Sequence, residues 1–128
     1  MKRKNHPPAP TESELAILKV LWRRGPCSVR EVWEEIAQKT GYTTTLKQMQ
    51  IMYEKGLVTR DERSVTHFYA SAVPEQGTKE KIVTGLIDRV FDGSASALVQ
   101  RALSAKPVSP AELRAIRELL DKAEEKRE

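Results

Sequence analysis

Cysteine is almost missing from this chain, which has Cys27 alone among its 128 residues. A single thiol excludes an intrachain disulfide and is typical of a protein kept in a reducing cytoplasm. Histidine is nearly as scarce, with His6 and His67. The sequence also contains no glycine-rich phosphate loop, no His-Glu-x-x-His motif and no nucleophile elbow. We therefore expect no enzyme activity, no metal site and no cofactor.

Long apolar runs are missing as well, and no stretch is long enough to span a bilayer, so we expect no membrane insertion. Residues 1–10 form a basic segment, interpreted as flexible, and no apolar region follows it as a secretory signal requires. The chain is 39% hydrophobic and 31% charged, which is too apolar for a disordered protein. These features predict a soluble cytoplasmic protein with one modest domain, or a small domain with an appendage that does not fold alone.

The excess positive charge lies in the first half of the chain. Residues 1–70 hold 12 Lys and Arg against 8 Asp and Glu, whereas residues 71–128 hold 10 of each kind. A basic half joined to a neutral half is typical of a nucleic-acid-binding head on an interaction tail. A net charge of +4 is also within ordinary scatter, so the charge alone does not decide the function.

Capping chemistry predicts where helices begin and end. In a capping box a hydroxyl residue stands three positions before a Glu, and the two side chains satisfy free N–H groups of the first turn. The sequence has three such boxes: Thr11 with Glu14, Ser28 with Glu31, and Ser109 with Glu112. Glycine accepts the left-handed conformation that ends many helices, and Gly25, Gly41 and Gly56 stand where the first three helices would close.

The first two helices each carry an apolar face, and we expect these faces to pack together. They comprise Leu15, Leu18, Leu21 and Trp22 in the first helix, and Val29, Val32, Trp33 and Ile36 in the second. Because Trp22 and Trp33 recur among aliphatic residues at helical spacing, we interpret both as core residues and not as groups that stack on bases.

The third helix, expected over residues 43–55, has two different faces. At about 100° per residue, one side gathers Thr45, Met49, Met52 and Tyr53, and the opposite side gathers Thr43, Lys47, Gln50 and Glu54. Thr, Lys and Gln suit a DNA major groove, because Lys binds phosphate or guanine, Gln pairs with adenine, and Thr contacts phosphate or the thymine methyl group. A solvated helix face has the same composition, so the position of this helix before a wing favours the DNA-binding interpretation.

A β-hairpin is expected after the third helix. Residues 57–60 and 65–69 are rich in β-branched and aromatic side chains, and the charged segment 61–64 joins them. Three helices followed by such a hairpin are the layout of a winged helix-turn-helix, in which the turn is the wing. The predicted fold class is therefore mainly α with a small β-hairpin, with a winged-helix DNA-binding domain at residues 11–73.

The predicted wing carries charges of both signs. Arg60 and Arg63 are candidates for contacts with flanking phosphates or a narrow minor groove. Asp61 and Glu62 would be repelled by phosphate, so they must point away from DNA or support the geometry of the turn.

Residues 74–128 are predicted to form a helical dimerisation region. Three apolar stripes recur there: Ile82, Val83, Leu86, Ile87, Val90 and Phe91; Leu98, Val99, Ala102 and Leu103; and Leu113, Ile116, Leu119, Leu120 and Ala123. Three short helices leave too small a core, and a second copy of the chain would cover the stripes by isologous packing. We assign dimerisation to Ile82, Leu86, Val90, Leu98, Leu113, Ile116 and Leu120. The alternative is that this tail folds back on its own head.

Several segments together resemble the BlaI/MecI/CopY family of bacterial transcriptional repressors, of the penicillinase-repressor type. They are residues 16–22 with Gly25 and Pro26, and residues 29–32, 42–45, 54–58 and 67–69. The resemblance continues through residues 91–94 and the last predicted helix, so it covers roughly residues 11–123. The combination is specific, although no single segment is.

The resemblance implies a homodimeric repressor whose third helix enters the major groove of a palindromic operator, which corresponds to Thr43, Thr44, Lys47 and Gln50 here. It also implies a regulatory partner, a membrane sensor with a zinc-protease domain, whose action leads to cleavage of the repressor in its tail. Arg101 and Ala102 align with the Asn-Phe pair of the cleaved branch, so we expect a protease of different specificity or an inducer that acts without cleavage. The copper-binding branch uses a C-terminal cysteine cluster, and this sequence supplies no such cluster.

The function predicted is a sequence-specific transcriptional repressor that binds double-stranded operator DNA as a homodimer. The alternative is a winged-helix protein-interaction module that does not bind DNA. Lys47, Arg60 and Arg63, on or beside the expected contact surface, favour the repressor.

Overall fold

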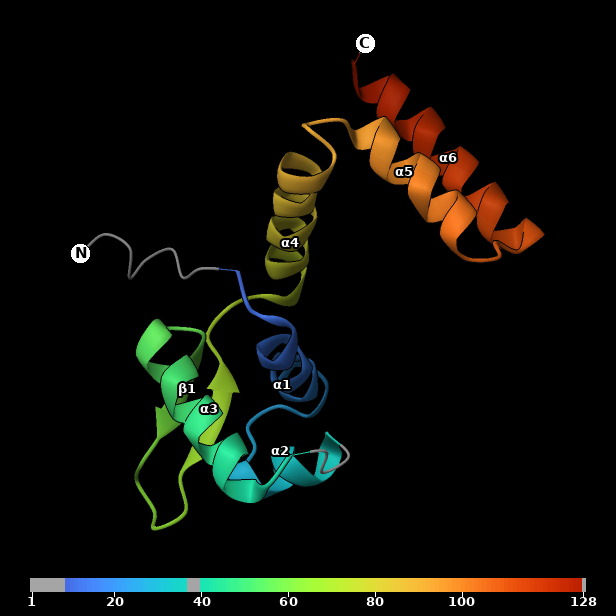
Figure 1. Ribbon diagram of the computed structural model, residues 1–128. Coiled ribbons are helices and arrows are strands. Elements are labelled where there is room, and N and C mark those ends of the chain that lie inside the picture. The colour runs from blue at the N-terminus through green and yellow to red at the C-terminus, as the bar shows by residue number, and fades with distance from the viewer. Residues whose placement is uncertain (1–8, 37–39, 128) are drawn as a thin grey trace. The chain divides into compact units, whose positions relative to one another are not determined.

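The computed structural model describes residues 9–36 and 40–127. Its elements, shown in Figure 1, are α1 (Glu12–Arg24), α2 (Val29–Glu35), α3 (Tyr42–Lys55), β1 (Val58–Asp61), β2 (Phe68–Ser71), α4 (Glu75–Val90), α5 (Ala95–Ala105) and α6 (Pro110–Arg127). The chain is mainly α-helical with one two-stranded antiparallel sheet, as predicted. It divides into two compact units, residues 1–84 and 85–128, and the division falls within α4. In the described part of the chain, no helix has both the length and the apolar character needed to cross a membrane.

Two of the predicted capping boxes form completely, at α1 and α2. Thr11 Oγ1 accepts the Glu14 N–H at 3.2 Å, and Glu14 Oε1 accepts the Thr11 N–H at 3.0 Å. Ser28 and Glu31 exchange the same pair of hydrogen bonds at 3.2 and 2.9 Å. These bonds satisfy N–H groups that a helix leaves without partners in its first turn, and they fix where α1 and α2 begin.

The glycines confirm two predicted helix ends and correct a third. Gly25 and Gly56 both have a φ of 87° and follow α1 and α3 directly. Gly41 does not close α2, which ends at Glu35 with Ile36 as its C-cap. Gly41 is instead the N-cap of α3, and its φ of −72° and ψ of 161° are the extended geometry that an N-cap residue takes.

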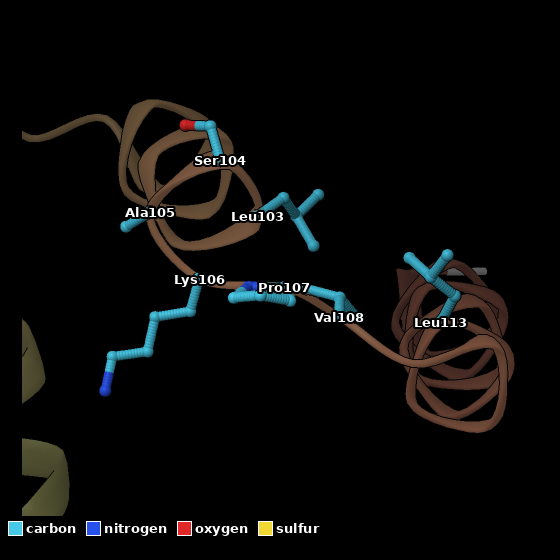
Figure 2. A pocket seen from close by; sticks show the side chains of 7 residues that line it. All are labelled: Leu103, Ser104, Ala105, Lys106, Pro107, Val108 and Leu113. Carbon is cyan, nitrogen blue, oxygen red and sulfur yellow. The ribbon is translucent and has the colours of Figure 1, made fainter.

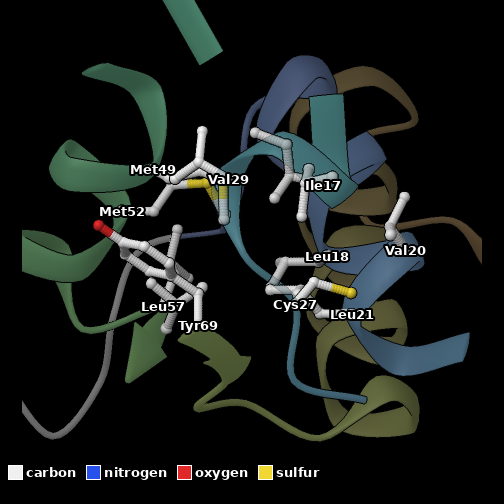
Figure 3. Packing of buried hydrophobic residues seen from close by; sticks show 12 residues of the cluster. Ile17, Leu18, Val20, Leu21, Cys27, Val29, Met49, Met52, Leu57 and Tyr69 are labelled. Atoms are coloured by element: carbon white, nitrogen blue, oxygen red, sulfur yellow. The ribbon is translucent and has the colours of Figure 1, made fainter. Parts of the chain in front are cut away.

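The core of the first unit lies among α1, α2, α3 and the hairpin. Its buried residues are Ile17, Leu18, Val20, Leu21, Cys27, Val29, Val32, Met49, Met52, Leu57, Val58 and Tyr69, most of which are labelled in Figure 3. Trp22 packs against this cluster as predicted, and its indole N–H donates to Ser71 Oγ at 2.9 Å and to the Val73 carbonyl at 3.0 Å. Trp33 is half-buried as well but is not among the residues that pack against this cluster, so its interpretation as a core residue is wrong; its indole N–H donates to the Thr40 carbonyl at 2.7 Å in an exposed position.

The hairpin has shorter pairing and a longer connection than predicted. The Cα partners are Val58 and Ser71, Thr59 and Ala70, Arg60 and Tyr69, and Asp61 and Phe68. Val65, expected in the second strand, is instead fully exposed in the connection. The last ladder pair is Asp61 with Phe68, so residues 62–67 form the connection, and within it the Arg63 N–H donates to Asp61 Oδ1 at 3.0 Å.

Cys27 joins the loop before α2 to the hairpin. Its N–H donates to the Tyr69 carbonyl at 2.9 Å, and the Tyr69 N–H donates back to the Cys27 carbonyl at 2.8 Å. Both residues are buried. Burial raises the pKa of the Cys27 thiol, so the thiol is neutral and serves as a core group.

An ion pair with a buried carboxylate joins α1 to α3. Glu14 is 2% exposed, and its Oε2 accepts from Lys55 Nζ at 2.7 Å. Burial by itself raises the pKa of Glu14, but hydrogen bonds from Lys55 and Thr11 outweigh burial and lower the pKa overall. The same carboxylate therefore caps α1 and holds the last turn of α3 against it.

The second unit buries little of its apolar surface. No residue of α5 or α6 is buried, and Leu119 and Leu120 are 64% and 60% exposed. Near the α5–α6 connection, a pocket of about 510 Å³ is lined by Leu103 and Leu113, as Figure 2 shows. The Ser109 hydroxyl accepts the N–H of Glu112 at 3.1 Å, which supports the predicted start of α6.

Candidate nucleic-acid interface

The sequence-predicted contact residues of α3 lie on one exposed face of that helix. Thr43, Thr44, Lys47 and Gln50 are all exposed. The opposite face is anchored in the core, with Thr45 2% exposed and Met49 and Met52 at 0%. This arrangement leaves the polar face free while the apolar face fixes the orientation of the helix. Tyr53, which was predicted on the buried side, is 39% exposed.

Arg60 is folded against the hairpin and α3. Its Nε donates to Glu62 Oε2 at 2.6 Å, and its guanidinium carbon lies 4.1 Å from the centre of the Tyr53 ring. Hydrogen bonds with Tyr69 and then Glu62 raise the pKa of Arg60. The Arg60 side chain is only 22% exposed, and its contact with Tyr53 stabilises the junction between β1 and α3.

Arg63 forms a two-bond ion pair within the wing. Its Nε and Nη2 donate to the two carboxylate oxygens of Asp61 at 3.0 and 2.8 Å. These hydrogen bonds lower the pKa of Asp61 to about 2. The Arg63 side chain is 90% exposed, so its remaining donors face solvent. The wing acids thus neutralise and orient the wing arginines, which is the supporting role that the sequence left open for them.

A groove runs between the helices and the wing. It has a volume of about 540 Å³ and is lined by residues of α2, α3 and the hairpin with its connection, among them Arg30, Gln50 and His67. Two predicted contact residues, Gln50 and Arg60, line the same groove. The structure therefore brings predicted contact residues of α3 and of the hairpin to one hollow in the first unit.

Sequence reasoning missed a cluster at the entrance to α3. The Arg30 guanidinium carbon lies 5.2 Å from the Tyr42 ring centre and 5.7 Å from the Trp33 ring centre. The two rings meet edge to face, with their centres 5.9 Å apart at 89°. The three-residue spacing of Arg30 and Trp33 on α2 was the available signal, since side chains at that spacing are neighbours on a helix. Tyr42 comes from α3 and no local pattern connects it to them.

The predicted dimerisation residues lie on α4, α5 and α6. Ile82 and Leu86 are half-buried, as are Leu98, Leu113 and Ile116. Val90 and Leu120 are 58% and 60% exposed. The chain by itself therefore leaves apolar surface uncovered on each of these helices.

Comparison with known proteins decides the family. The family model described as penicillinase repressor matches residues 10–122. The chain belongs to the penicillinase repressor family. It is accordingly a DNA-binding transcriptional repressor and not an enzyme, and the resemblance noted in the sequence is confirmed. The part of this repressor with the fold of a DNA-binding domain is the winged helix-turn-helix.

Relatives of this repressor are regulators of antibiotic resistance by name. The chain is 24% identical over 114 residues to the methicillin resistance regulatory protein MecI of Mammaliicoccus sciuri, covering 88% of this chain and 93% of the relative. It is 25% identical to MecI of Staphylococcus aureus strain N315, with the same coverage.

Two solved structures are also similar to this repressor. One, with 19% identity and a TM-score of 0.47, concerns regulation of DNA binding of Bordetella bronchiseptica BpsR by 6-hydroxynicotinic acid; the match covers 91% of this chain and 76% of that one. The other is a probable transcriptional regulator from Pseudomonas aeruginosa, with 21% identity and a TM-score of 0.47, covering 95% and 83%.

Proposed function

We propose that this repressor acts in the cytoplasm as a homodimer on a palindromic operator, with α3 of each copy in a major groove. The observation that carries the proposal is the exposed polar face of α3, which stands before a wing and is held in place by a buried apolar face. Such a helix fits the major groove of B-DNA, where base edges present distinct donor and acceptor patterns.

In this proposal the side chains divide into two groups. Lys47 and Gln50 read base edges, and Thr43 and Thr44 contact phosphate or a thymine methyl group. Arg63 donates its solvent-facing N–H groups to a flanking phosphate while its hydrogen bonds to Asp61 remain intact. Arg60, which is largely covered, contributes to DNA binding chiefly by holding the wing against α3.

Dimerisation is proposed to use the uncovered apolar surface of residues 74–128. When one head of a dimer is bound, the second head has a high effective concentration at the other half-site. A dimer therefore binds a palindrome far more tightly than a single head does. The seven assigned residues, Ile82, Leu86, Val90, Leu98, Leu113, Ile116 and Leu120, are the ones expected to meet the second copy. If the tail folds back on its own head instead, the full chain is a monomer in solution.

Release from DNA is proposed to involve a membrane metalloprotease sensor and a change within the tail. Arg101 and Ala102 lie inside α5, so a protease acting between them requires this helix to open. The competing functional proposal remains a protein-interaction module, in which the exposed face of α3 meets a protein and binds no duplex.

The test is a binding titration on DNA selected by the full chain from a random duplex pool. Lys47→Ala and Gln50→Ala should each cost about 1–3 kcal/mol per half-site and flatten the preference for selected over scrambled DNA. Lys19→Ala is the matched control, because Lys19 is an exposed residue of α1. Selection that yields no enriched sequence would favour the interaction module, and variants that bind like the parent would contradict the assignment of α3.

Dimerisation has its own test by sedimentation of the full chain. Leu120→Glu places a carboxylate in the apolar stripe of α6 and should shift the protein from dimer toward monomer. Ala111→Glu places the same group on an exposed position of α6 outside the stripe and should leave the dimer intact. A monomeric parent chain at micromolar concentration would contradict the proposal.

A further inference from the structure

Arg30 is an arginine on a platform of two aromatic rings. Its guanidinium lies over both Trp33 and Tyr42, at 5.7 and 5.2 Å from their centres. The Trp33 ring is itself fixed, because its N–H donates to the Thr40 carbonyl at 2.7 Å, in the segment that leads into α3. The charge of Arg30 is therefore held at the beginning of the recognition helix.

The other arginines within residues 9–36 and 40–84 are engaged differently. Arg23, Arg24, Arg60 and Arg63 all form ion pairs with carboxylates of α2 or of the wing. Within residues 9–36 and 40–84, Arg30 pairs with rings and with no carboxylate. Contacts with rings do not engage the N–H groups of a guanidinium as an ion pair does, and these are the groups that bind phosphate in a bidentate manner.

Arg30 also stands in the groove between α3 and the wing. Tyr42, Gln50, Thr66 and His67 line the same groove of about 540 Å³. Among the described residues that line it, none is acidic. A hollow with cationic and hydrogen-bonding side chains and no carboxylate in its lining suits an anionic chain.

We infer that this groove seats a sugar-phosphate strand of the operator and that Arg30 binds one of its phosphates. The inference rests on the proposed function, in which α3 occupies the major groove. The strand that borders that groove then passes beside α3 on the side of the wing. Because the aromatic platform already orders the guanidinium, binding loses little side-chain entropy. Phosphate contacts of this kind set the register of a protein on DNA and carry no direct sequence information.

The test measures how operator binding by the full chain depends on salt. Arg30→Ala should lower the slope of log affinity against log salt by about 1 per head, hence by about 2 for a dimer on a palindrome. Binding to selected and to scrambled duplex should weaken by the same factor. Arg23→Ala is the matched control, since Arg23 is exposed and paired with Glu35, and it should keep the parent slope.

Variants of the platform separate orientation from charge. Tyr42→Phe keeps the ring and should bind like the parent, whereas Tyr42→Ala should weaken binding to all sequences while Arg30 keeps its charge. Thermal melting of each variant verifies that the head is folded.

The outcomes separate this inference from the proposed function. If the parent binds its selected duplex but Arg30→Ala has the parent slope and affinity, the inference is wrong and the proposed function stands. If Arg30→Ala changes which sequence is preferred instead of weakening all duplexes alike, Arg30 reads a base and the phosphate assignment is overturned. A parent that binds no duplex overturns both.

Discussion

Replacing Glu14 by Gln isolates the buried charge that joins α1 to α3. Gln has nearly the same shape and still offers an oxygen to the Thr11 N–H, so the capping geometry is preserved. What it removes is the negative charge together with the oxygen that accepts from Lys55 Nζ at 2.7 Å, because the amide NH2 takes the place of that oxygen. The substitution therefore tests whether the ion pair, and not merely the volume of the side chain, holds α3 in place.

The expected cost follows from the two hydrogen bonds that the carboxylate accepts. A hydrogen bond to a charged group contributes about 1.5–3 kcal/mol, against about 0.5–1.5 kcal/mol for a neutral one. The Lys55 side chain is 36% exposed and is rehydrated when its partner loses charge, which reduces the loss. We expect Glu14→Gln to destabilise the head by about 1–2 kcal/mol, which corresponds to a fall of about 5–15 °C in melting temperature for a domain of this size.

The assay is urea unfolding at several pH values, with Glu12→Gln as the matched control. Glu12 is an exposed acid in the same first turn, so it shares the interaction with the helix dipole but is not buried. Because the folded state lowers the pKa of Glu14, its contribution is fully present above the ordinary Glu pKa of about 4.3 and is lost as pH falls through the lower folded value. The difference between the parent and Glu14→Gln should therefore shrink in acid. Equal stability of the Glu14→Gln and Glu12→Gln variants at neutral pH would refute the reasoning.

Three further changes have defined outcomes. Trp22→Phe removes the indole N–H that donates to Ser71 and Val73, and should cost about 0.5–1.5 kcal/mol per hydrogen bond in urea unfolding, because the Ser71 hydroxyl and the Val73 carbonyl still bond to each other. Deleting residues 85–128, which form the second compact unit, should give a monomer in sedimentation and lower operator affinity roughly 100-fold or more; unchanged affinity would contradict binding through avidity. Mass spectrometry of the protein from induced cells should show a fragment ending between Asp92 and Lys106 if release proceeds by cleavage, and an intact released chain would eliminate cleavage.

The sequence predicted those features that depend on short-range chemistry. Capping boxes at Thr11 and Ser28 and the left-handed position of Gly56 involve residues only a few positions apart, and the structure confirms them. The two faces of α3 follow from helical periodicity, which placed Met49 and Met52 in the core correctly.

Features that depend on contacts between distant parts of the chain could not be predicted from the sequence. Gly41 suits a helix end and a helix start equally, and only the extended backbone before α3 decides between them. The bridge between Cys27 and Tyr69 joins residues that are far apart in the chain. Tyr42 and Arg30 belong to different helices and meet only in the folded protein. The connection in the hairpin is longer than predicted because Asp61 pairs with Phe68, and β-propensity does not determine which residues of two strands pair.

Hydroxyl-radical footprinting of the full chain on its selected duplex tests the central claim most directly. A homodimer with α3 of each copy in a major groove should protect two symmetric regions whose centres are about 10 base pairs, or a multiple of that, apart. Protection should extend to the backbone positions that flank each major groove. A single protected region, or two regions without a common symmetry axis, would contradict binding of a palindromic operator by a dimer.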